Sequence, residues 1–187
     1  MINRIKSNIR KRLLKRLRNQ KEVERLKRSF QIQKKLFSLP EFIKAKTVMF
    51  YLSFNGEVET FRMIEKAISL GKRIAAPVIN RRSRKLIPYF IFDSLDDLRV
   101  GPYGICEPKH EHMCSVPLKN IDLVVVPAIA FDLNGNRIGR GMGYYDRFLH
   151  FLPKRSSSIG IVFKLQILNK IPSLETYDIS VGKVIYS

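Results

Sequence analysis

Residues 131–147 combine glycines, arginines and an acid in an arrangement suited to binding phosphate. The segment reads FDLNGNRIGRGMGYYDR, with three glycines at alternate positions. Alternating glycines let the backbone turn tightly and bring its N–H groups close to a ligand. Arg137 and Arg140 add positive charges whose planar fork matches phosphate oxygens. We therefore predict a polyphosphate cradle, although the segment contains neither a Walker A loop nor the dinucleotide Gly-x-Gly-x-x-Gly pattern.

A helix predicted from about residue 143 to 151 follows the glycines. Its N-terminus carries partial positive charge, which favours a bound anion. Asp146, in the first turn, can hold a Mg²⁺ ion that bridges phosphates. The alternative needs no ligand, because an ordinary strand-to-helix connection with a hairpin turn at Asn134-Gly135 has the same residues.

Basic residues are concentrated in the first quarter of the chain. The chain has 35 Lys and Arg against 16 Asp and Glu, a net charge of +19, and residues 1–46 hold 16 basic and 3 acidic residues, a net of +13. Such a region indicates an anionic partner, which could be nucleic acid, phosphates or an acidic membrane surface, or simply a solvated helical face. Lys6 and Arg10 share one helix face, but chemistry alone does not distinguish them from the other basic residues.

A nucleic-acid-binding module is the main competing class. Residues 1–29 contain no aromatic side chain on which a base could stack. Weak, salt-sensitive binding to RNA follows from the charge alone. We therefore expect no specific nucleic-acid partner.

Both cysteines and two of the three histidines fall within nine residues, at Cys106, His110, His112 and Cys114. The spacing Cys-x-x-x-His-x-His-x-Cys matches no standard structural zinc pattern. We expect a polar surface loop here, with a zinc site as the alternative. Two cysteines cannot form a disulfide scaffold, so the chain has the character of a cytosolic protein.

The composition predicts one folded domain. A chain of 187 residues with 45% hydrophobic and 27% charged residues is close to the globular average, which excludes wholesale disorder. No apolar run approaches the ~18 residues of a membrane span. Residues 1–20 contain no acid, as in a mitochondrial transit peptide, but the helical pattern continues past them. We expect a cytoplasmic protein, with a mitochondrial location as the alternative.

Two helices are predicted before residue 40. The first carries one apolar stripe at helical spacing, formed by Ile2, Ile5, Ile9, Leu13 and Leu17. The second runs from about residue 23 to 36 and stops at Pro40. We treat residues 1–40 as a basic helical arm and residues 41–187 as an α/β body, together making a single domain over 1–187.

The body alternates strands and helices. Residues 47–52 and 73–79 are predicted strands around a helix that Thr60 caps and Gly71 closes. This βαβ unit predicts a parallel sheet with a right-handed crossover. Residues 121–126 form the strongest strand, β-branched and without alternation, so we expect it to be central and covered on both faces. Weaker strands are predicted at 86–92, 159–163 and 184–186.

Several segments together resemble the 5-formyltetrahydrofolate cyclo-ligase family, also called methenyltetrahydrofolate synthetase. Residues 135–147 are similar to its glycine-loop signature, which is highly specific, whereas the other segments are individually weak. These others are Lys6-Ser-Asn-Ile-Arg10, Tyr51–Thr60, Gly101–Pro108, Phe163–Gln166, Ile171-Pro172 and Asp178. Their order and spacing cover nearly the whole chain.

The resemblance implies a fold and a reaction. The fold would be a single Rossmann-like α/β domain with a mostly parallel sheet and helices on both faces. The reaction would convert 5-formyltetrahydrofolate and MgATP to 5,10-methenyltetrahydrofolate, ADP and phosphate. ATP would phosphorylate the formyl oxygen, and N10 of the folate would then attack the activated carbon. ATP and Mg²⁺ are thus the expected cofactors, and we expect small-molecule partners only, no membrane and a monomer.

The resemblance also implies roles for individual residues. The implied ATP contacts are Lys6, Arg10, Arg137, Ile138, Gly139, Arg140, Gly141, Met142, Gly143, Tyr144 and Tyr145. The implied folate contacts are Leu52, Glu57, Tyr103, Arg140, Gly141, Met142, Gly143 and Tyr144. Asp146 would bind Mg²⁺, with Asp178 as a second acid near the metal. Without the resemblance, Glu57 reads as an exposed loop acid, and Tyr103 is as well explained by loop packing as by stacking on the pterin.

Four positions depart from the family pattern. Met142 stands where Gly or Lys is common, Tyr177 where many members have His, Gly182 where an acid is common, and Glu59 where many carry Asp. The departures at 177 and 182 put the C-terminal metal environment in doubt. The remaining alternatives are an ATP-binding domain without the folate activity and a relative acting on another N-formyl or amide substrate.

Overall fold

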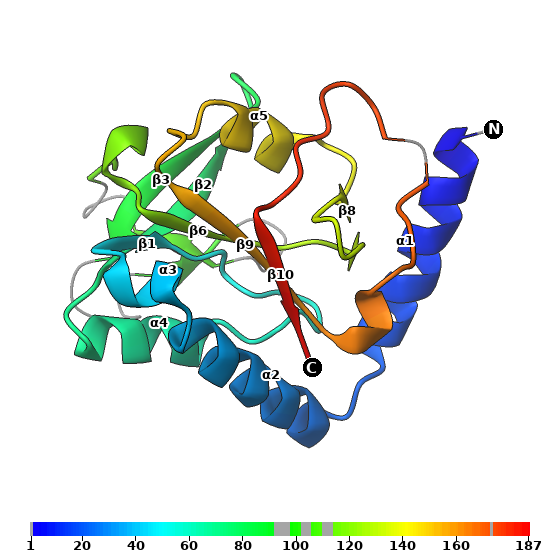
Figure 1. The fold of residues 1–187 in the computed structure, drawn as a ribbon, viewed down its shortest axis with the longest axis horizontal. Coiled ribbons are helices and arrows are strands. Elements are labelled where there is room, and N and C mark those ends of the chain that lie inside the picture. Colours follow the sequence, from blue (N-terminus) through cyan, green and yellow to red (C-terminus); the bar gives the residue numbers. More distant parts are fainter. Residues whose placement is uncertain (1, 92–97, 102–105, 110–113, 173) are drawn as a thin grey trace.

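A six-stranded sheet forms the centre of the computed structural model (Figure 1). The strands are, in spatial order, β10 (Lys183–Tyr186), β9 (Ser157–Val162), β6 (Leu123–Val126), β1 (Thr47–Met49), β2 (Arg73–Asn80) and β3 (Lys85–Ile91). The first five run parallel, and β3 pairs antiparallel with β2. The structure describes residues 2–91, 98–101, 106–109, 114–172 and 174–187.

Two small hairpins accompany this sheet. The first pairs β4 (Leu98–Val100) with β5 (Cys106–Pro108), and the second pairs β7 (Ala130–Phe131) with β8 (Arg137–Ile138). Short 3₁₀ turns cover Leu118–Asn120 and Lys164–Gln166. The β7–β8 hairpin matters most here, because the glycine-rich segment begins at its end.

In the described part of the chain, five α-helices pack around the sheet: α1 (Ile2–Arg18), α2 (Glu22–Phe37), α3 (Pro40–Lys44), α4 (Phe61–Ser69) and α5 (Tyr144–His150). Figure 1 shows α2, α3 and α4 on one face, α5 on the other and α1 beside the sheet. Neighbouring residues of β1 pack into different cores. Val48 packs with residues of α2, α3 and α4, and Met49 packs with residues of α5. The mostly parallel α/β fold with helices on both faces is confirmed.

The central strand is correctly predicted. All four residues of β6 are buried, between β1 and β9, as expected for a β-branched run covered on both faces. The unit β1–α4–β2 also has the predicted parallel pairing. Strand β1 is shorter than predicted, because the chain leaves the sheet after Met49 and forms the wall of a pocket described below.

The predicted cap of α4 is wrong. Thr60 precedes the helix, but its hydroxyl donates to the main-chain oxygen of Tyr51 at 2.7 Å instead of capping. The carboxylate of Glu59 accepts the first main-chain N–H groups, from Phe61 at 2.7 Å and Arg62 at 3.3 Å. A carboxylate suits this position because it meets the positive end of the helix dipole.

The apolar stripe predicted on α1 is only partly buried. Leu13 and Leu17 are each 1% exposed, but Ile5 is 45% exposed while Lys6 is only 8% exposed. The first half of α1 borders a polar pocket rather than the core, so a cation turns inward there.

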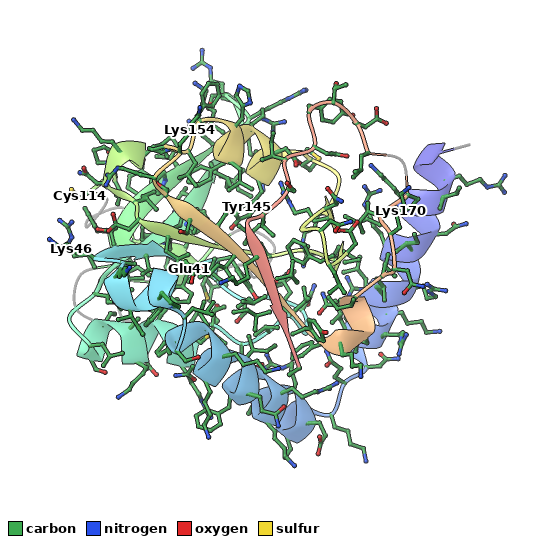
Figure 2. All side chains as sticks on the ribbon, viewed as in Figure 1. Glu41, Lys46, Cys114, Tyr145, Lys154 and Lys170 are labelled. Carbon is green, nitrogen blue, oxygen red and sulfur yellow. The ribbon has the colours of Figure 1, made fainter. Side chains whose placement is uncertain are left out.

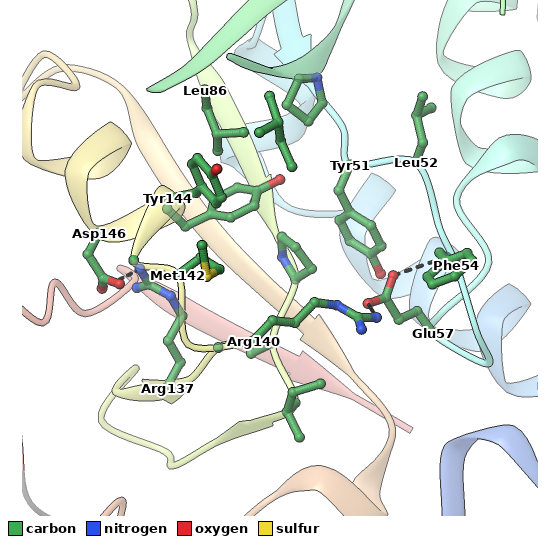
Figure 3. A pocket seen from close by; sticks show the side chains of 18 of the residues that line it. Tyr51, Leu52, Phe54, Glu57, Leu86, Arg137, Arg140, Met142, Tyr144 and Asp146 are labelled. Carbon is green, nitrogen blue, oxygen red and sulfur yellow. Dashed lines mark hydrogen bonds and ion pairs between the residues drawn. The ribbon is translucent and has the colours of Figure 1, made fainter. Parts of the chain in front are cut away.

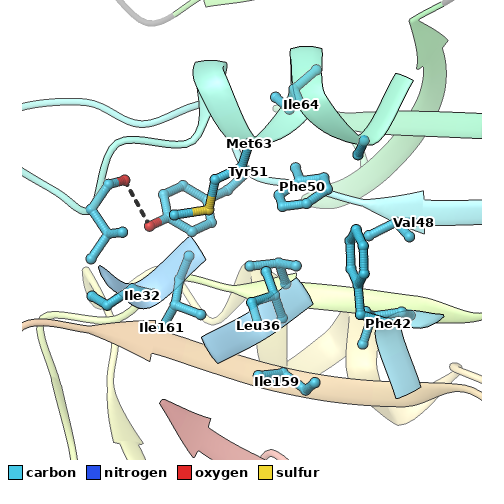
Figure 4. Close-up of a cluster of buried hydrophobic side chains, with 14 of the residues drawn as sticks. Ile32, Leu36, Phe42, Val48, Phe50, Tyr51, Met63, Ile64, Ile159 and Ile161 are labelled. Carbon is cyan, nitrogen blue, oxygen red and sulfur yellow. Dashed lines mark hydrogen bonds between the residues drawn. The ribbon is translucent and has the colours of Figure 1, made fainter. Parts of the chain in front are cut away.

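The helices before residue 40 share the main core with the sheet (Figure 4). Leu17 of α1 and Ile32 and Leu36 of α2 pack with strand residues such as Val48 and Ile159. Helix α2 ends at Phe37, and Pro40 opens α3. Among the described residues, no helix is both long and apolar enough to cross a membrane. The division into arm and body stays a prediction.

Candidate active site

The site lies where the connections of the sheet change direction. The chain proceeds from β1 to β2 on one side and from β6 to β9 and β10 on the other, so β1 and β6 flank the switch point. Ligands of open α/β sheets bind outside the carboxyl ends of strands at such a point. Tyr51 and Leu52 follow β1, residues 127–129 follow β6, and all of them line one pocket.

This first pocket, which we call the apolar pocket, has a volume of about 190 Å³. Apolar side chains make up most of its wall, and Glu57 and Arg140 are among the few charged groups (Figure 3). Its other lining residues include Leu52, Phe54, Pro77, Ile79, Leu86, Pro127, Met142, Tyr144 and Tyr145. A flat heterocycle that buries its faces and pairs one polar edge fits a pocket of this kind.

The second pocket, which we call the cationic pocket, is larger, at about 860 Å³. Lys6 and Arg10 enter it from α1, and Arg137 and Arg147 from the chain around the glycine loop. Three acids, Asp146, Glu175 and Asp178, also line it. Several cations around one hollow suit an anionic ligand with several charges.

The glycine loop, residues 139–143, separates the two pockets. Gly139, Met142 and Gly143 line both of them, as do the flanking residues Arg137 and Asp146. Gly141 and Gly143 have φ angles of +99° and +63°, in the left-handed region that glycine adopts without strain. The loop is thus a thin wall with one ligand pocket on each side.

The hairpin before the loop is held by one buried acid. The carboxylate of Asp132 accepts three main-chain hydrogen bonds of 3.0–3.1 Å, from Asn134, Asn136 and Ile171. Helix α1 holds the loop itself, because Arg10 Nε donates to the main-chain oxygen of Gly139 at 2.9 Å. The loop is therefore fixed from two sides before any ligand binds.

Glu57 is buried on the wall of the apolar pocket, with its side chain 10% exposed. Its Oε1 lies 2.7 Å from Nη2 of Arg140, and its Oε2 accepts the main-chain N–H of Phe54 at 3.1 Å. Burial raises the pKa of the carboxyl above its ordinary value, and Arg140 and the Phe54 N–H oppose the rise. Glu57 is thus a desolvated acceptor aimed at a ligand pocket.

Two ion pairs border the cationic pocket. Arg137 Nη2 lies 2.6 Å from Asp146 Oδ1, and Arg137 Nη1 donates to the main-chain oxygen of Ile179. Lys6 Nζ lies 3.3 Å from Asp178 Oδ2. Burial lowers the pKa of Arg137, and the facing Asp146 opposes that change. These pairs join α1, the loop and residues 175–179 around one hollow.

Tyr145 has a buried hydroxyl beside this centre, and Figure 2 shows the residue in the middle of the molecule. The hydroxyl has no hydrogen-bond partner among the described residues. Burial raises the pKa of Tyr145, and the charge of Glu57 raises it further, so the group stays protonated. It is a buried donor that a small rearrangement or a ligand could satisfy.

Comparison with known proteins decides the family. A model of the 5-formyltetrahydrofolate cyclo-ligase family matches residues 2–187, which is nearly the whole chain. The chain belongs to this family. It is therefore an enzyme of the ligase class in folate metabolism, and the cyclo-ligase family uses ATP as a substrate.

Individual relatives agree with this assignment. The 5-formyltetrahydrofolate cyclo-ligase of Escherichia coli K12 is 31% identical over 152 residues, covering 81% of this chain and 83% of that protein. The enzyme of that name from Mus musculus is 28% identical over 194 residues, covering 99% and 95%. The structure of Aquifex aeolicus 5,10-methenyltetrahydrofolate synthetase superposes with a TM-score of 0.83 at 32% identity, covering 97% of this chain and 89% of that one.

The cyclo-ligase fold gathers the predicted ATP residues around the glycine loop but divides them between the pockets. Those that line the cationic pocket are Lys6, Arg10, Arg137, Ile138, Gly139, Gly141, Met142 and Gly143. Arg140, Tyr144 and Tyr145 line only the apolar pocket. Arg140 of the loop and the following Tyr144 and Tyr145 therefore line the apolar pocket, whereas the loop lines the cationic pocket largely with its glycines.

The predicted folate residues mostly meet in the apolar pocket. Leu52, Glu57, Arg140, Met142, Gly143 and Tyr144 line it, whereas Gly141 lines the cationic pocket. Tyr103 lies outside the described residues, as do His110 and His112 of the Cys/His cluster. Cys106 lines the apolar pocket and Cys114 is exposed.

The predicted metal ligands share one pocket without forming a preformed cage. Within the described ranges, no three His, Cys, Asp or Glu side chains come together as a metal cluster. Asp146 and Asp178 each pair with a cation through one oxygen, and no hydrogen bond in the described part engages the other oxygen. One or two carboxylates with phosphate oxygens is the donor set that Mg²⁺ takes beside nucleotides, so the residues fit this ion.

Sequence reasoning missed part of the apolar pocket. Pro77, Ile79 and Leu86 come from the β2–β3 hairpin, and Phe54 lies within the segment that resembles the family without being singled out. The hairpin residues carry no motif, and only the pairing of Ile79 with Leu86 in the sheet brings them to the pocket. Arg147 and Ile179, on the cationic pocket, were also missed, although each directly follows a predicted metal ligand in the sequence.

Proposed function

We propose that this chain catalyses the ATP-dependent cyclisation of 5-formyltetrahydrofolate to 5,10-methenyltetrahydrofolate, with release of ADP and phosphate. One observation carries the proposal: the glycine loop is the common wall of an apolar pocket and a cationic pocket. A phosphoryl group bound over this loop can therefore be reached from both sides.

The folate would occupy the apolar pocket. The pyrimidine ring of its pterin is flat, and one edge of this ring carries an amino group and a ring N–H, from which a carboxylate accepts hydrogen bonds. Glu57 is the buried carboxylate on that wall, and Leu52, Met142 and Tyr144 offer apolar surface. This arrangement supports orientation of the ring with the formyl group toward the loop.

ATP would occupy the cationic pocket. Lys6 and Arg10 would neutralise its phosphates from α1, and the backbone N–H groups of the glycine loop would approach them closely. Asp146 and Asp178 would hold Mg²⁺, which neutralises phosphate charge and orients the chain of phosphates when it is bound. Arg137 would hold the Asp146 carboxylate in place, since their atoms lie 2.6 Å apart.

The chemistry then needs two displacements. The formyl oxygen attacks the γ-phosphorus, ADP leaves, and the formyl carbon becomes the carbon of an imidate-type phosphate. N10 attacks that carbon and loses its proton, the C–O bond breaks, phosphate leaves, and the five-membered methenyl ring remains. The amide-like oxygen is a poor leaving group until it is phosphorylated, so ATP is consumed in the activation. The protein mainly positions both substrates and stabilises charge.

The test is to mix the purified chain with 5-formyltetrahydrofolate and MgATP and follow the methenyl chromophore, with ATP omitted as the control. We expect ATP-dependent product. Lys6→Ala should raise the KM for ATP, and Arg155→Ala, which removes an equal charge outside both pockets, should not. Binding of ATP without any product would leave the cationic pocket standing and contradict the folate assignment.

A further inference from the structure

The apolar pocket is crossed by a contact of the protein with itself. Arg140 of the glycine loop and Glu57 of the opposite wall point toward one another, with 2.7 Å between Nη2 and Oε1 (Figure 3). The guanidinium also lies 5.7 Å from the centre of the Phe54 ring. All three residues line the pocket. In the ligand-free protein, the planar guanidinium of Arg140 is thus paired with the Glu57 carboxylate, which faces the proposed substrate pocket.

The guanidinium has the same donor pattern as one edge of the proposed substrate. The pterin presents its 2-amino group and N3–H in one plane about a single carbon, and a guanidinium presents two N–H groups in the same way. Both are planar and both can rest on an aromatic ring. Arg140 therefore makes to Glu57 the kind of hydrogen bond that the substrate would make.

We propose that Arg140 and the pterin edge of the folate bind the Glu57 carboxylate in turn, and that the displaced Arg140 then serves the phosphoryl group in transfer. This inference rests on the proposed function. It gives Arg140 a role both in the free protein and in the complex with substrates. Arg140 is the substrate's competitor in the free protein and a catalytic residue in the complex with both substrates.

The exchange keeps the buried Glu57 carboxylate paired both before and after the folate binds. Glu57 is desolvated, so removing its partner without a replacement would be costly, but the pterin N–H groups replace the guanidinium. The side chain of Arg140 is 43% exposed, and Glu57 is its only hydrogen-bonding partner among the described residues. Once the carboxylate is taken, the contact that remains for the guanidinium in the described part is the one with the Phe54 ring.

The displaced Arg140 side chain starts close to the proposed ATP site. Its neighbours Gly139 and Gly141 line the cationic pocket, so the backbone that carries Arg140 lies against the proposed ATP site. A Cβ built on Gly141 would meet only the Arg10 guanidinium, at 3.8 Å, so little packs against the loop beside Arg140. An arginine brought to a transferring phosphoryl group stabilises its charge.

Two consequences separate this exchange from a static ion pair. In the exchange, folate alone must break the Arg140 contact, so the contact lowers the apparent folate affinity. ATP attracts the freed guanidinium, so ATP and folate must each strengthen binding of the other. In a static pair, Arg140 orders Glu57 and adds positive charge, so its loss would weaken binding of the anionic folate.

The experiment measures 5-formyltetrahydrofolate binding to the full chain by calorimetry, without ATP, at about pH 8, because alkaline pH favours the ionised form of Glu57. The proteins are the unmodified chain, Arg140→Ala and Arg155→Ala. The control removes an equal charge at a residue that lines neither pocket. We expect Arg140→Ala to bind about fivefold more tightly than the unmodified chain, the effect of an ion pair worth about 1 kcal/mol, and Arg155→Ala to bind unchanged.

A non-hydrolysable ATP analogue completes the test. It should strengthen folate binding to the unmodified chain and leave Arg140→Ala unaffected, while turnover by Arg140→Ala falls about a hundredfold. Equal or weaker folate binding by Arg140→Ala overturns the exchange. If that occurs while the unmodified chain forms the methenyl product, the exchange alone is wrong. If the unmodified chain neither binds folate nor forms product, the proposed function fails and the exchange with it.

Discussion

The environment of the Glu57 carboxyl opposes its ionisation. Burial raises its pKa above 4.5, and Arg140 opposes the rise. The other groups near it are Tyr51 and Tyr145, whose own pKa values are raised by burial and by the Glu57 charge, and Arg25, which donates to the main-chain oxygen of Glu57. The carboxylate form is therefore lost on acidification earlier than for an exposed glutamate.

This shift predicts a pH dependence of folate binding. In the proposed complex the ionised form of Glu57 accepts the pterin edge, so affinity should fall as the pH decreases through a midpoint above 4.5. In Arg140→Ala the midpoint should move higher still, because the group that opposes the rise is gone. Calorimetric affinity measured against pH tests this, with Glu57→Gln as the control whose weak binding should not show that step. A midpoint at or below 4.5 in the unmodified chain would contradict it.

Two buried tyrosines with different hydrogen bonding give a matched pair. Tyr51 donates to the main-chain oxygen of Val58 at 3.1 Å, whereas the Tyr145 hydroxyl has no partner in the described part of the chain. Removing an unsatisfied hydroxyl relieves a desolvation cost, so Tyr145→Phe should raise the free energy of unfolding by about 1 kcal/mol. Tyr51→Phe should lower it by about 1 kcal/mol, since the Val58 oxygen loses its donor. Urea denaturation of both variants measures the difference, and two changes of equal sign would refute the assignment.

At the scale of elements, α1 is positioned by a close contact with the segment that carries Glu57. A Cβ on Gly56 would lie 2.1 Å from the main-chain oxygen of Leu17, and Gln20 donates hydrogen bonds to the oxygens of both residues. The helix that supplies Lys6 to one pocket is thus joined to the wall of the other.

Comparing two glycines with similar backbone angles, Gly56 and Gly71, isolates the energetic effect of this contact. Gly56 has φ +80° and Gly71 has φ +75°, but a Cβ on Gly71 would meet nothing within 4 Å. Gly71→Ala should therefore cost only the left-handed strain, about 1 kcal/mol of unfolding free energy. Gly56→Ala carries the same strain plus a clash with backbone and should cost at least about twice as much. Thermal denaturation of the two variants measures these losses of stability. Equal losses would show that α1 moves away from residue 56 without cost.

Some elements could be predicted because their signal is local. The unbroken apolar run at 123–126 and the alternate glycines at 139–143 indicate their roles within a few residues. The cap by Glu59 is local, but the sequence does not show that the Thr60 hydroxyl donates to Tyr51 and leaves the capping to Glu59. The burial of Lys6 could not be predicted, because it depends on neighbours distant in the sequence such as Asp178. Glu57 shows the same limit, since its residue type suggests solvent and only the fold encloses it.

At the scale of the whole molecule, the charge should govern how the substrates arrive. The chain carries a net charge of +19, and both proposed substrates are anions. Basic side chains point outward around the molecule, as Lys46, Lys154 and Lys170 show in Figure 2. Such a field raises association rates at low ionic strength and is screened within about 10 Å at 0.1 M salt.

We therefore expect kcat/KM for both substrates to fall as salt increases, with kcat changing less. Steady-state rates in increasing KCl, with a matched series in an osmolyte that carries no charge, measure this. A kcat/KM that does not change with salt would show that the surface charge has no part in substrate capture.

The cationic pocket brings together side chains that lie far apart along the chain. Lys6 and Arg10 come from α1 and Asp178 from the segment before β10, and Lys6 and Asp178 are joined by an ion pair across 172 positions. A ribosome therefore makes Lys6 long before it makes Asp178. The proposed nucleotide site is incomplete until residue 178 has emerged, so we expect nucleotide to stabilise only a chain that has been synthesised past this point.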